Sequence, residues 1–201
     1  MPLGDDNQRK TTPYITWALI ALNVIAFLLT FINLDKIITV YGFTPSDFSI
    51  LTILTSMFLH AGIAHIVGNM WFLFIFGDNV EDRLGHVKYL VFYLVAGIVA
   101  TLAHYALNIN ESIPSVGASG AISGVLGAYI VFFPKAGVYV SGGIGRIGKI
   151  SAWIMLGLWF AFQIAQSLLL GNTAGIAFGA HIGGFVFGAI VAGIVRIVKK
   201  G

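Results

Sequence analysis

The chain of 201 residues contains no cysteine and few charged side chains. The absence of cysteine excludes disulfide bonds, thiolate metal ligands and a cysteine nucleophile. Only 9% of the residues are charged, whereas about 25% are charged in an average soluble domain. Hydrophobic residues make up 58% of the chain, and its mean hydropathy is +0.92. These proportions argue against a water-soluble protein and predict one that lies in a membrane.

What the sequence does contain is a series of apolar runs that can each cross a hydrocarbon core about 30 Å thick, which takes roughly 20 residues. Turn residues and charges separate these runs and predict an all-α, multi-pass membrane protein. The predicted spans are residues 14–32, 58–76, 87–107, 117–133, 150–170 and 177–197. Residues 1–201 are interpreted as a single membrane domain. The long connection 33–57 mixes aromatic and charged side chains and is expected to lie in the outer interface.

The basic residues are distributed unevenly among the loops. Ten of the eleven lysines and arginines fall on one side of the six predicted spans, and Lys36 alone falls on the other. The ten are Arg9, Lys10, Arg83, Lys88, Lys135, Arg146, Lys149, Arg196, Lys199 and Lys200. Cytoplasmic loops carry the excess of basic residues, so both termini are expected in the cytoplasm. The net charge of +3 then follows from topology and requires no nucleic acid partner.

Four strongly hydrogen-bonding side chains lie inside predicted spans or at their heads, where such groups are costly and usually functional. His65 and Asn69 are four residues apart and share one face of the second helix. Ser119 lies at the head of the fourth helix and His181 near the head of the sixth. Because these three helices all begin at the outer side, we expect the four side chains at one shallow depth. They predict a polar, water-accessible site.

Each of these residues taken alone has a structural interpretation, because an intramembrane serine commonly supports helix packing and an asparagine or histidine can join two helices. Together they suit acyl transfer. None of the eight acidic residues falls within a predicted span, so a buried Ser-His-Asp triad is not expected. A dyad remains, with Ser119 as nucleophile and His181 as general base and acid. Asn69 and His65 are candidate donors to the oxyanion.

Small residues surround the serine in the segment GASGAISG, residues 117–124. Gly117 and Gly120 leave room for irregular backbone and for close approach of a substrate. Glycines at small-xxx-small spacing, which lets two helices touch, recur in the fourth and sixth spans. They are Gly120, Gly124, Gly127, Gly184 and Gly188. We therefore expect these two helices to be in contact, as they must be if Ser119 is to reach His181.

Four segments together resemble the rhomboid family of intramembrane serine proteases. They are HAGIAHIVGN (60–69), GDNVEDRLG (77–85), GASG (117–120) and AHIGGFVFG (180–188). The resemblance implies a compact bundle of six transmembrane helices and a serine endopeptidase that uses no metal or cofactor.

Carried over residue by residue, the family pattern implies Ser119 as nucleophile, His181 as its base, and Asn69 and His65 on the oxyanion side. A structural role is implied for Glu81 and Gly85, and His60 matches a further histidine often found at the top of the second helix.

The implied substrates are membrane proteins whose transmembrane segment is cut near the outer face. The expected location is the cell membrane of a prokaryote, with the lipid bilayer as surroundings and neither nucleic acid nor nucleotide as a partner. Two features depart from the family. The Trp-Arg pair that many members carry in the first outer loop is absent here. In addition, some members carry an aromatic ring one turn after the serine, packed on the catalytic histidine. This chain has Ser123 there. Either His181 is held less firmly, or Ser123 adds a hydrogen bond.

Other functions remain as alternatives. A metal transporter would use His60, His65 and His181, but the chain has no HExxH motif and no carboxylate in a predicted span. A catalytically weak relative that binds membrane clients would keep the same fold.

The segment GGIGRIGK, residues 142–149, has the glycine spacing of a dinucleotide-binding loop, but Ile150 stands where a P-loop needs serine or threonine. It is expected to be a flexible cytoplasmic loop.

Overall fold

The computed structural model describes residues 1–141, 147–170 and 177–199. Six long helices form the bundle, and short elements fill the connections. In chain order the elements are β1 (Pro2–Asp5), α1 (Tyr14–Thr30), the 3-10 turn η1 (Phe31–Asn33), α2 (Leu34–Tyr41), α3 (Ile50–Thr55), the 3-10 turn η2 (Ser56–Phe58), α4 (Ile63–Leu84), α5 (His86–Leu107), α6 (Ser119–Phe132), β2 (Gly137–Ser141), β3 (Ile147–Ser151), α7 (Ala152–Leu170) and α8 (Phe178–Val198). The predicted compact six-helix membrane bundle is confirmed.

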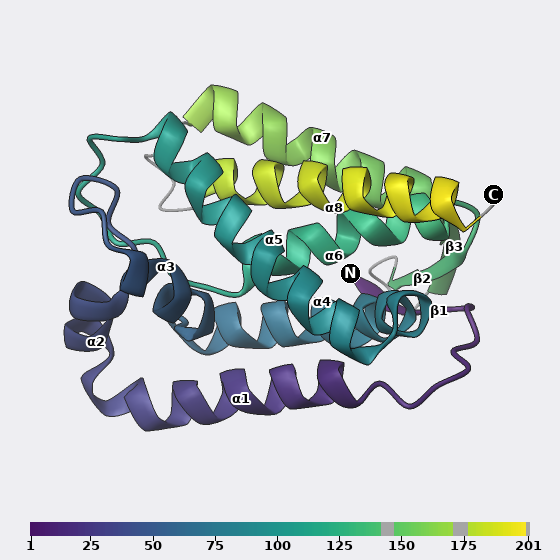
Figure 1. Ribbon diagram of the computed structural model, residues 1–201, viewed down its shortest axis with the longest axis horizontal. Helices are drawn as coiled ribbons and strands as arrows, with labels where there is room; N and C mark the ends of the chain where they lie inside the picture. Colours follow the sequence, from purple (N-terminus) through teal and green to yellow (C-terminus); the bar gives the residue numbers. More distant parts are fainter. Residues whose placement is uncertain (142–146, 171–176, 200–201) are drawn as a thin grey trace.

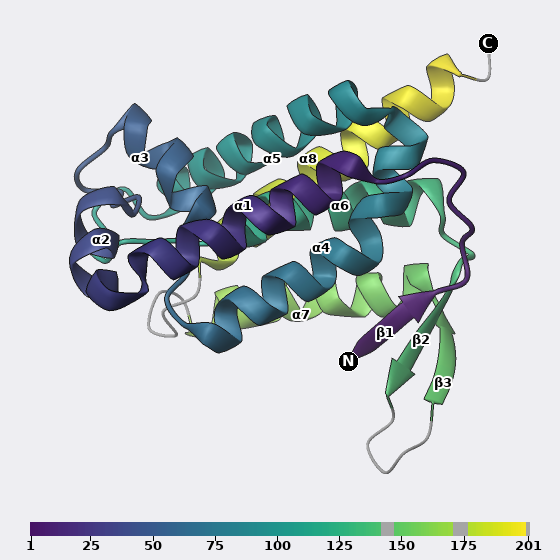
Figure 2. The ribbon, with the colours of Figure 1, turned by 90° about the horizontal axis from the view of Figure 1, so that it is seen from below.

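Helix α6 lies in the middle of the bundle, where it contacts α4, α5, α7 and α8 (Figures 1 and 2). The other five long helices are long and apolar enough to cross a membrane. Helix α6 has only 14 residues, which is a length of about 21 Å and less than the hydrocarbon thickness. It can be short because its residues from Gly120 to Tyr129 are buried among the other helices. Its first residue therefore lies inside the bundle rather than at its surface.

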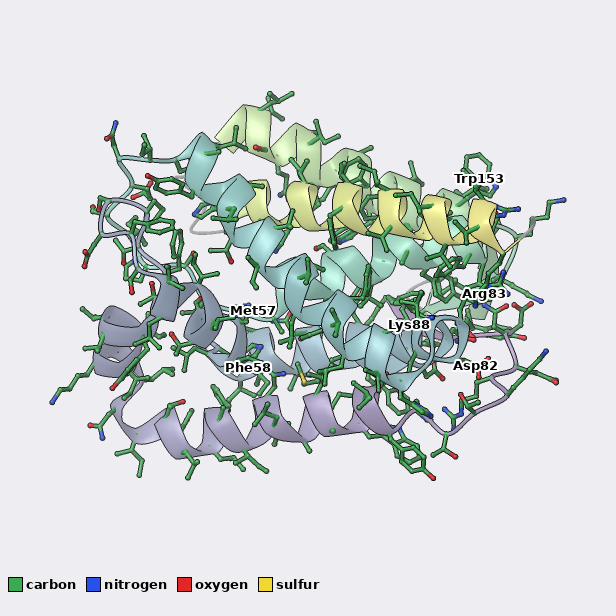
Figure 3. All side chains as sticks on the ribbon, viewed as in Figure 1. Met57, Phe58, Asp82, Arg83, Lys88 and Trp153 are labelled. Atoms are coloured by element: carbon green, nitrogen blue, oxygen red, sulfur yellow. The ribbon has the colours of Figure 1, made fainter. Side chains whose placement is uncertain are left out.

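The two ends of the bundle differ. Helices α2 and α3 pack at one end, called here the α2 end, and the three strands lie at the other, called here the sheet end (Figures 1 and 2). The charged side chains of Asp82, Arg83 and Lys88 lie toward the sheet end, whereas Met57 and Phe58 lie toward the α2 end (Figure 3). The connection 33–57, predicted as an interfacial segment, contains the short helices α2 and α3 and exposes apolar residues such as Ile50 and Leu51.

Helix α4 differs from its predicted span of 58–76. It begins at Ile63 and continues to Leu84, so that Asp78, Glu81 and Asp82 are part of the helix. The inference that no acidic residue lies in a span is therefore wrong. The polar stretch stays helical because the segment before α1 and the first turn of α1 supply its partners, among them the backbone N–H groups of Thr11 and Thr16. The other five helices begin and end within two residues of their predicted ranges.

Gly85 separates α4 from α5 and has a φ of 87°. A positive φ of this size is favourable for glycine and costly for other residues, so the tight junction explains why glycine stands here. The side chain of Glu81 below this junction is fully buried and binds both the start of α1 and His86 of α5. The structural role expected for these two residues agrees with this geometry.

The described residues that flank positions 142–146 form strands, so Gly148 and Lys149 of the predicted flexible loop belong to β3. Strands β2 and β3 pair antiparallel, and β1 from the N-terminus joins the free edge of β2 to give the order β1-β2-β3. In β2 the side chain of Val138 is buried and that of Tyr139 is exposed, as expected for a strand with one buried face. Lys149 of β3 forms an ion pair with Asp6 at 2.6 Å. Most of the dinucleotide-like segment, residues 142–146, lies outside the described residues.

The N-terminal strand is also fixed to the bundle by hydrogen bonds. The Asp5 carboxylate accepts from the Tyr129 hydroxyl of α6 at 2.6 Å and from the Asn79 amide of α4 at 3.0 Å. Burial raises the pKa of Asp5 to about 6, and the nearby Asp78 carboxyl adds to the increase. The strand that the sequence did not predict thus connects the sheet to the two helices that line the site described below.

Glycines bring α6 and α8 into backbone contact. A methyl group added to Gly188 would collide with the carbonyl of Gly124, and one added to Gly184 would collide with the carbonyl of Gly120. On the other helix, a methyl group on Gly127 would meet the backbone of Phe185. The expected contact between the two helices is present, and it depends on residues without a Cβ.

The Gly188→Ala variant is expected to be less stable than the wild type and less able to hold Ser119 against His181. Overpacking of this kind costs about 1–3 kcal/mol, because α8 must move away from α6. Thermal unfolding in detergent measures the effect, which corresponds to a Tm lower by roughly 2–12 °C. Gly193→Ala is the matched control on the same helix, since no described atom lies within 4 Å of the added methyl group. Equal melting of the two variants would contradict the packing argument.

Candidate active site

Ser119 is the first residue of α6, and the chain before it is held in an irregular path. Gly117 has a φ of 128°, and a methyl group there would collide with the imidazole of His65. The N–H of Gly117 donates to the carbonyl of Ser56 at 2.9 Å, and Ser115 pairs with Phe43. These contacts fasten the segment to the α2 end of the bundle. Glycine is needed here for both its conformation and its small size.

The Ser119 hydroxyl and the His181 ring form a direct contact across the α6–α8 interface. Ser119 Oγ lies 2.8 Å from Nε2 of His181, which is one turn into α8. The distance is that of a hydrogen bond, and the pair comes from residues 62 positions apart in the chain. The two residues proposed from sequence as nucleophile and base are therefore neighbours.

Gln163 of α7 is a member of this cluster that the sequence analysis missed. Its side-chain oxygen Oε1 lies 2.7 Å from Nδ1 of His181, and the residue is 7% exposed. The imidazole is thus bound at both nitrogens. A glutamine within an apolar span is the same signal that singled out Asn69, so applying that criterion to the fifth span would have found it.

Ser123 does not take the place of the aromatic ring that some rhomboid proteins carry one turn after the serine. Its hydroxyl donates to the backbone carbonyl of Ser119 at 2.7 Å, within α6. The aromatic neighbour of His181 comes from another helix, since the ring of Trp159 in α7 lies 6.2 Å from the imidazole between centroids. The hydrogen bond considered for Ser123 is present, but it goes to the helix backbone.

A cavity of about 400 Å³ opens beside this pair. His65, Asn69, Ser119 and His181 all line it, so the structure brings the four sequence-predicted residues together. Apolar side chains form much of the remaining wall, and Gln163 and Ser123 add to its polar part. The lining residues from the neighbouring helices include Phe72, Ile122, Leu126 and Trp159. The cavity combines a polar cluster with an apolar wall, as small binding sites commonly do.

Two side chains of α4 present donors to this cavity. The amide nitrogen Nδ2 of Asn69 is buried and has no hydrogen-bond partner among the described residues. Nδ1 of His65 accepts the backbone N–H of Ala61 at 3.3 Å, which leaves the proton of a neutral ring on Nε2. Nε2 is the atom that lies against Gly117. Both side chains therefore bring an N–H group to the cavity that Ser119 also lines.

The acidic side chains of α4 lie at its other end. Asp78 is nine residues beyond Asn69, which is about 14 Å along a helix. Within the described ranges, no group of three or more histidine, aspartate or glutamate side chains gathers in a way that could hold a metal ion. His60 is buried and packs edge-on against the ring of His65, with 5.1 Å between centroids.

The helices and their composition define a multi-pass membrane protein, and its cavity contains a serine hydrogen-bonded to a histidine. The sequence model of the rhomboid domain family matches residues 47–197 of this chain. The chain belongs to the rhomboid family.

Relatives from bacteria and from mitochondria share this similarity. Rhomboid protease GluP of Bacillus subtilis (strain 168) is 31% identical over 215 residues, covering 99% of this chain and 40% of the relative. RHOMBOID-like protein 6, mitochondrial, of Arabidopsis thaliana is 36% identical over 137 residues, covering 68% of this chain and 40% of the relative. The human presenilin-associated rhomboid-like protein, mitochondrial, is 29% identical, covering 91% of this chain and 47% of the relative. The chain thus spans less than half the length of each. Family membership supports a protease-like function within the membrane.

Proposed function

We propose that the protein is a serine endopeptidase that hydrolyses peptide bonds in or next to the transmembrane segments of other membrane proteins. The observation that carries the proposal is the 2.8 Å contact between Ser119 Oγ and His181 Nε2 at the wall of a cavity. A hydroxyl at this distance from a neutral imidazole nitrogen has a general base in place. No acidic residue is required for the proton transfer.

In the first half of the reaction, Ser119 Oγ attacks the carbonyl carbon of the substrate while Nε2 of His181 takes the hydroxyl proton. The carbonyl oxygen becomes an oxyanion, for which Asn69 Nδ2 and His65 Nε2 are the candidate donors. The C–N bond then breaks, and the imidazolium returns the proton to the leaving amine. In the second half, water adds to the acyl carbon, its proton passes to His181 and then to Ser119 Oγ, and the carboxylic acid leaves.

The attachment of the segment before α6 to the α2 end supports hydrolysis close to one surface of the membrane. The backbone of Gly117, two residues before Ser119, donates to Ser56, and Ser115 pairs with Phe43. With both termini in the cytoplasm, as the distribution of basic residues predicts, the α2 end faces outward. We propose that the protein lies in the cell membrane of a prokaryote and that substrate helices are cut near its outer face.

Covalent labelling tests this proposal directly. In proteoliposomes, the wild type is expected to react with a fluorophosphonate probe and to cleave a reporter transmembrane segment, because the probe requires an activated serine. The Ser119→Ala variant is expected to do neither. Ser123→Ala, four residues further along the same helix, is the matched control and should still be labelled. If Ser119→Ala cleaves the reporter as fast as the wild type, the assignment is wrong.

The two alternatives give different results in the same vesicles. A protein that only binds membrane clients would leave the reporter intact, and Ser119→Ala would still retain the clients. A metal transporter would show uptake into vesicles that a chelator abolishes, with no labelling of Ser119. Either pattern would replace the protease proposal.

A further inference from the structure

The imidazole of His181 has three neighbours from two helices other than its own. Ser119 of α6 meets Nε2, while Gln163 and Trp159 of α7 meet Nδ1 and the ring. A neutral histidine carries its proton on one nitrogen only, and the partner of the other nitrogen decides which one. To act as a base toward Ser119, the ring needs a free lone pair on Nε2 and therefore a proton on Nδ1.

An amide oxygen can accept a hydrogen bond but cannot donate one. Because Oε1 of Gln163 lies 2.7 Å from Nδ1 of His181, the contact requires the ring proton on Nδ1. Gln163 is itself 7% exposed, so few alternative partners compete for its oxygen. We propose, on the basis of the protease function above, that Gln163 is a positioning residue that keeps His181 in the tautomer able to take the proton of Ser119.

A neutral amide suits this place better than an acid would. A carboxylate within a span is costly to bury unless it is paired, and the described acidic side chains of α4 are near the sheet end. Glutamine supplies the acceptor at Nδ1 without a charge. The cost is electrostatic, because an amide stabilises the imidazolium formed during the reaction less than a carboxylate does.

The position of Gln163 makes the base depend on α7. Residues beside it on this helix point away from the bundle, with Leu158 67% and Phe162 58% exposed. Helix α7 is the least buried of the five helices that are long and apolar enough to cross a membrane. Gln163 and Trp159 are one turn apart on the inner face of α7, and together they hold the ring. A displacement of α7 would remove both contacts from His181.

The test compares three substitutions in the full chain. Gln163→Met keeps a side chain of similar length but removes the oxygen that accepts from His181. Gln163→Glu keeps an accepting oxygen at the same position of the side chain. Gln166→Met is the matched control, since Gln166 lies on the same helix and outside the described lining of the cavity. Rates of reporter cleavage, with kcat and KM separated, and the nitrogen NMR signals of ¹⁵N-histidine report activity and tautomer independently.

A positioned general base contributes about 10²- to 10⁴-fold, and loss of its orientation is expected to remove about 10- to 100-fold from kcat in Gln163→Met, with KM nearly unchanged. The same variant should lose the signal of His181 protonated on Nδ1, assigned by its absence from His181→Ala. Gln163→Glu should recover that signal and most of the rate, and Gln166→Met should resemble the wild type. A simple packing role would instead leave Gln163→Met, which fills a similar volume, with a rate close to that of the wild type.

Two results would overturn the inference: Gln163→Met with wild-type kcat, or an Nδ1-protonated signal that persists in Gln163→Met. The NMR measurement needs no catalysis. If the wild type proved unable to cleave or to be labelled, the protease function would fail, and the tautomer of His181 in the three variants would still decide what Gln163 does.

Discussion

The His181→Ala variant is expected to cleave a membrane-protein reporter about 10³-fold or more slowly than the wild type. The substitution leaves Ser119 Oγ without the nitrogen that lies 2.8 Å away, and the described lining of the cavity contains no carboxylate that could replace it. The loss should appear in kcat, because the proton transfer occurs only in the transition state. Initial rates in proteoliposomes with a single-span reporter measure it, and labelling by a fluorophosphonate probe should fall in parallel.

His86→Ala provides the matched control for this experiment. His86 lies at the start of α5, near the sheet end, and its side chain is 41% exposed. Its removal takes one partner from Glu81 but leaves the described lining of the cavity unchanged, so the cleavage rate is expected to stay within about a factor of two of the wild-type rate. Near wild-type cleavage by His181→Ala would mean that another group accepts the serine proton, and the proposed dyad would have to be abandoned.

Replacing Glu81 by leucine is expected to cause the largest loss of stability among single substitutions at the sheet end. The carboxylate is fully buried and accepts the N–H groups of Ile15 and Thr16 and the hydroxyl of Thr16, at 2.7–2.9 Å. Helix α1 begins at Tyr14, so these are N–H groups of its first turn, which have no partner within the helix. Glu81 therefore caps α1 from α4, and it also binds Nδ1 of His86 at 2.6 Å.

Leucine would bury these donors without partners, at a cost of about 3–5 kcal/mol. Thermal unfolding in detergent should show a Tm lower by roughly 10 °C, since each kcal/mol corresponds to about 2–4 °C in a chain of this size. Glu81→Gln should lose less, because the amide oxygen can still accept. Glu111→Leu is the control, as the Glu111 carboxylate binds only the neighbouring N–H groups of Ser112 and Ile113 among the described residues. Similar melting of Glu81→Leu and Glu111→Leu would refute the capping role.

Local patterns in the sequence were sufficient for the helices and for most of the site. Apolar runs predict spans because a helix in lipid satisfies its own backbone hydrogen bonds, so composition and length decide where a span lies. The polar residues His65, Asn69, Ser119 and His181 were recognisable because such side chains are rare in apolar surroundings. The glycines of the fourth and sixth spans indicated close helix contact by their spacing. None of these inferences required knowledge of distant contacts.

Most of the features that sequence analysis missed depend on contacts between distant segments. Helix α4 continues past its predicted end because residues before α1 and in its first turn bind its polar side chains, and the N-terminal strand pairs with β2. Ser123 faces its own helix backbone, while Trp159 supplies the ring beside His181. A charged residue usually marks the end of a membrane span, but Glu81 lies within α4 because its carboxylate is bound by residues more than 60 positions away. Such distant partners cannot be recognised from the local sequence.

By itself the sequence determined that this chain is a bundle of membrane helices with a serine and a histidine on neighbouring spans, because burial in lipid selects residues by their local polarity. The tertiary structure alone decided how those side chains meet. The depth of Ser119 depends on the enclosure of the short helix α6, and the partner of His181 at Nδ1 depends on the rotation of α7. Helix rotation is set by packing among several helices at once, and no single stretch of sequence contains that information.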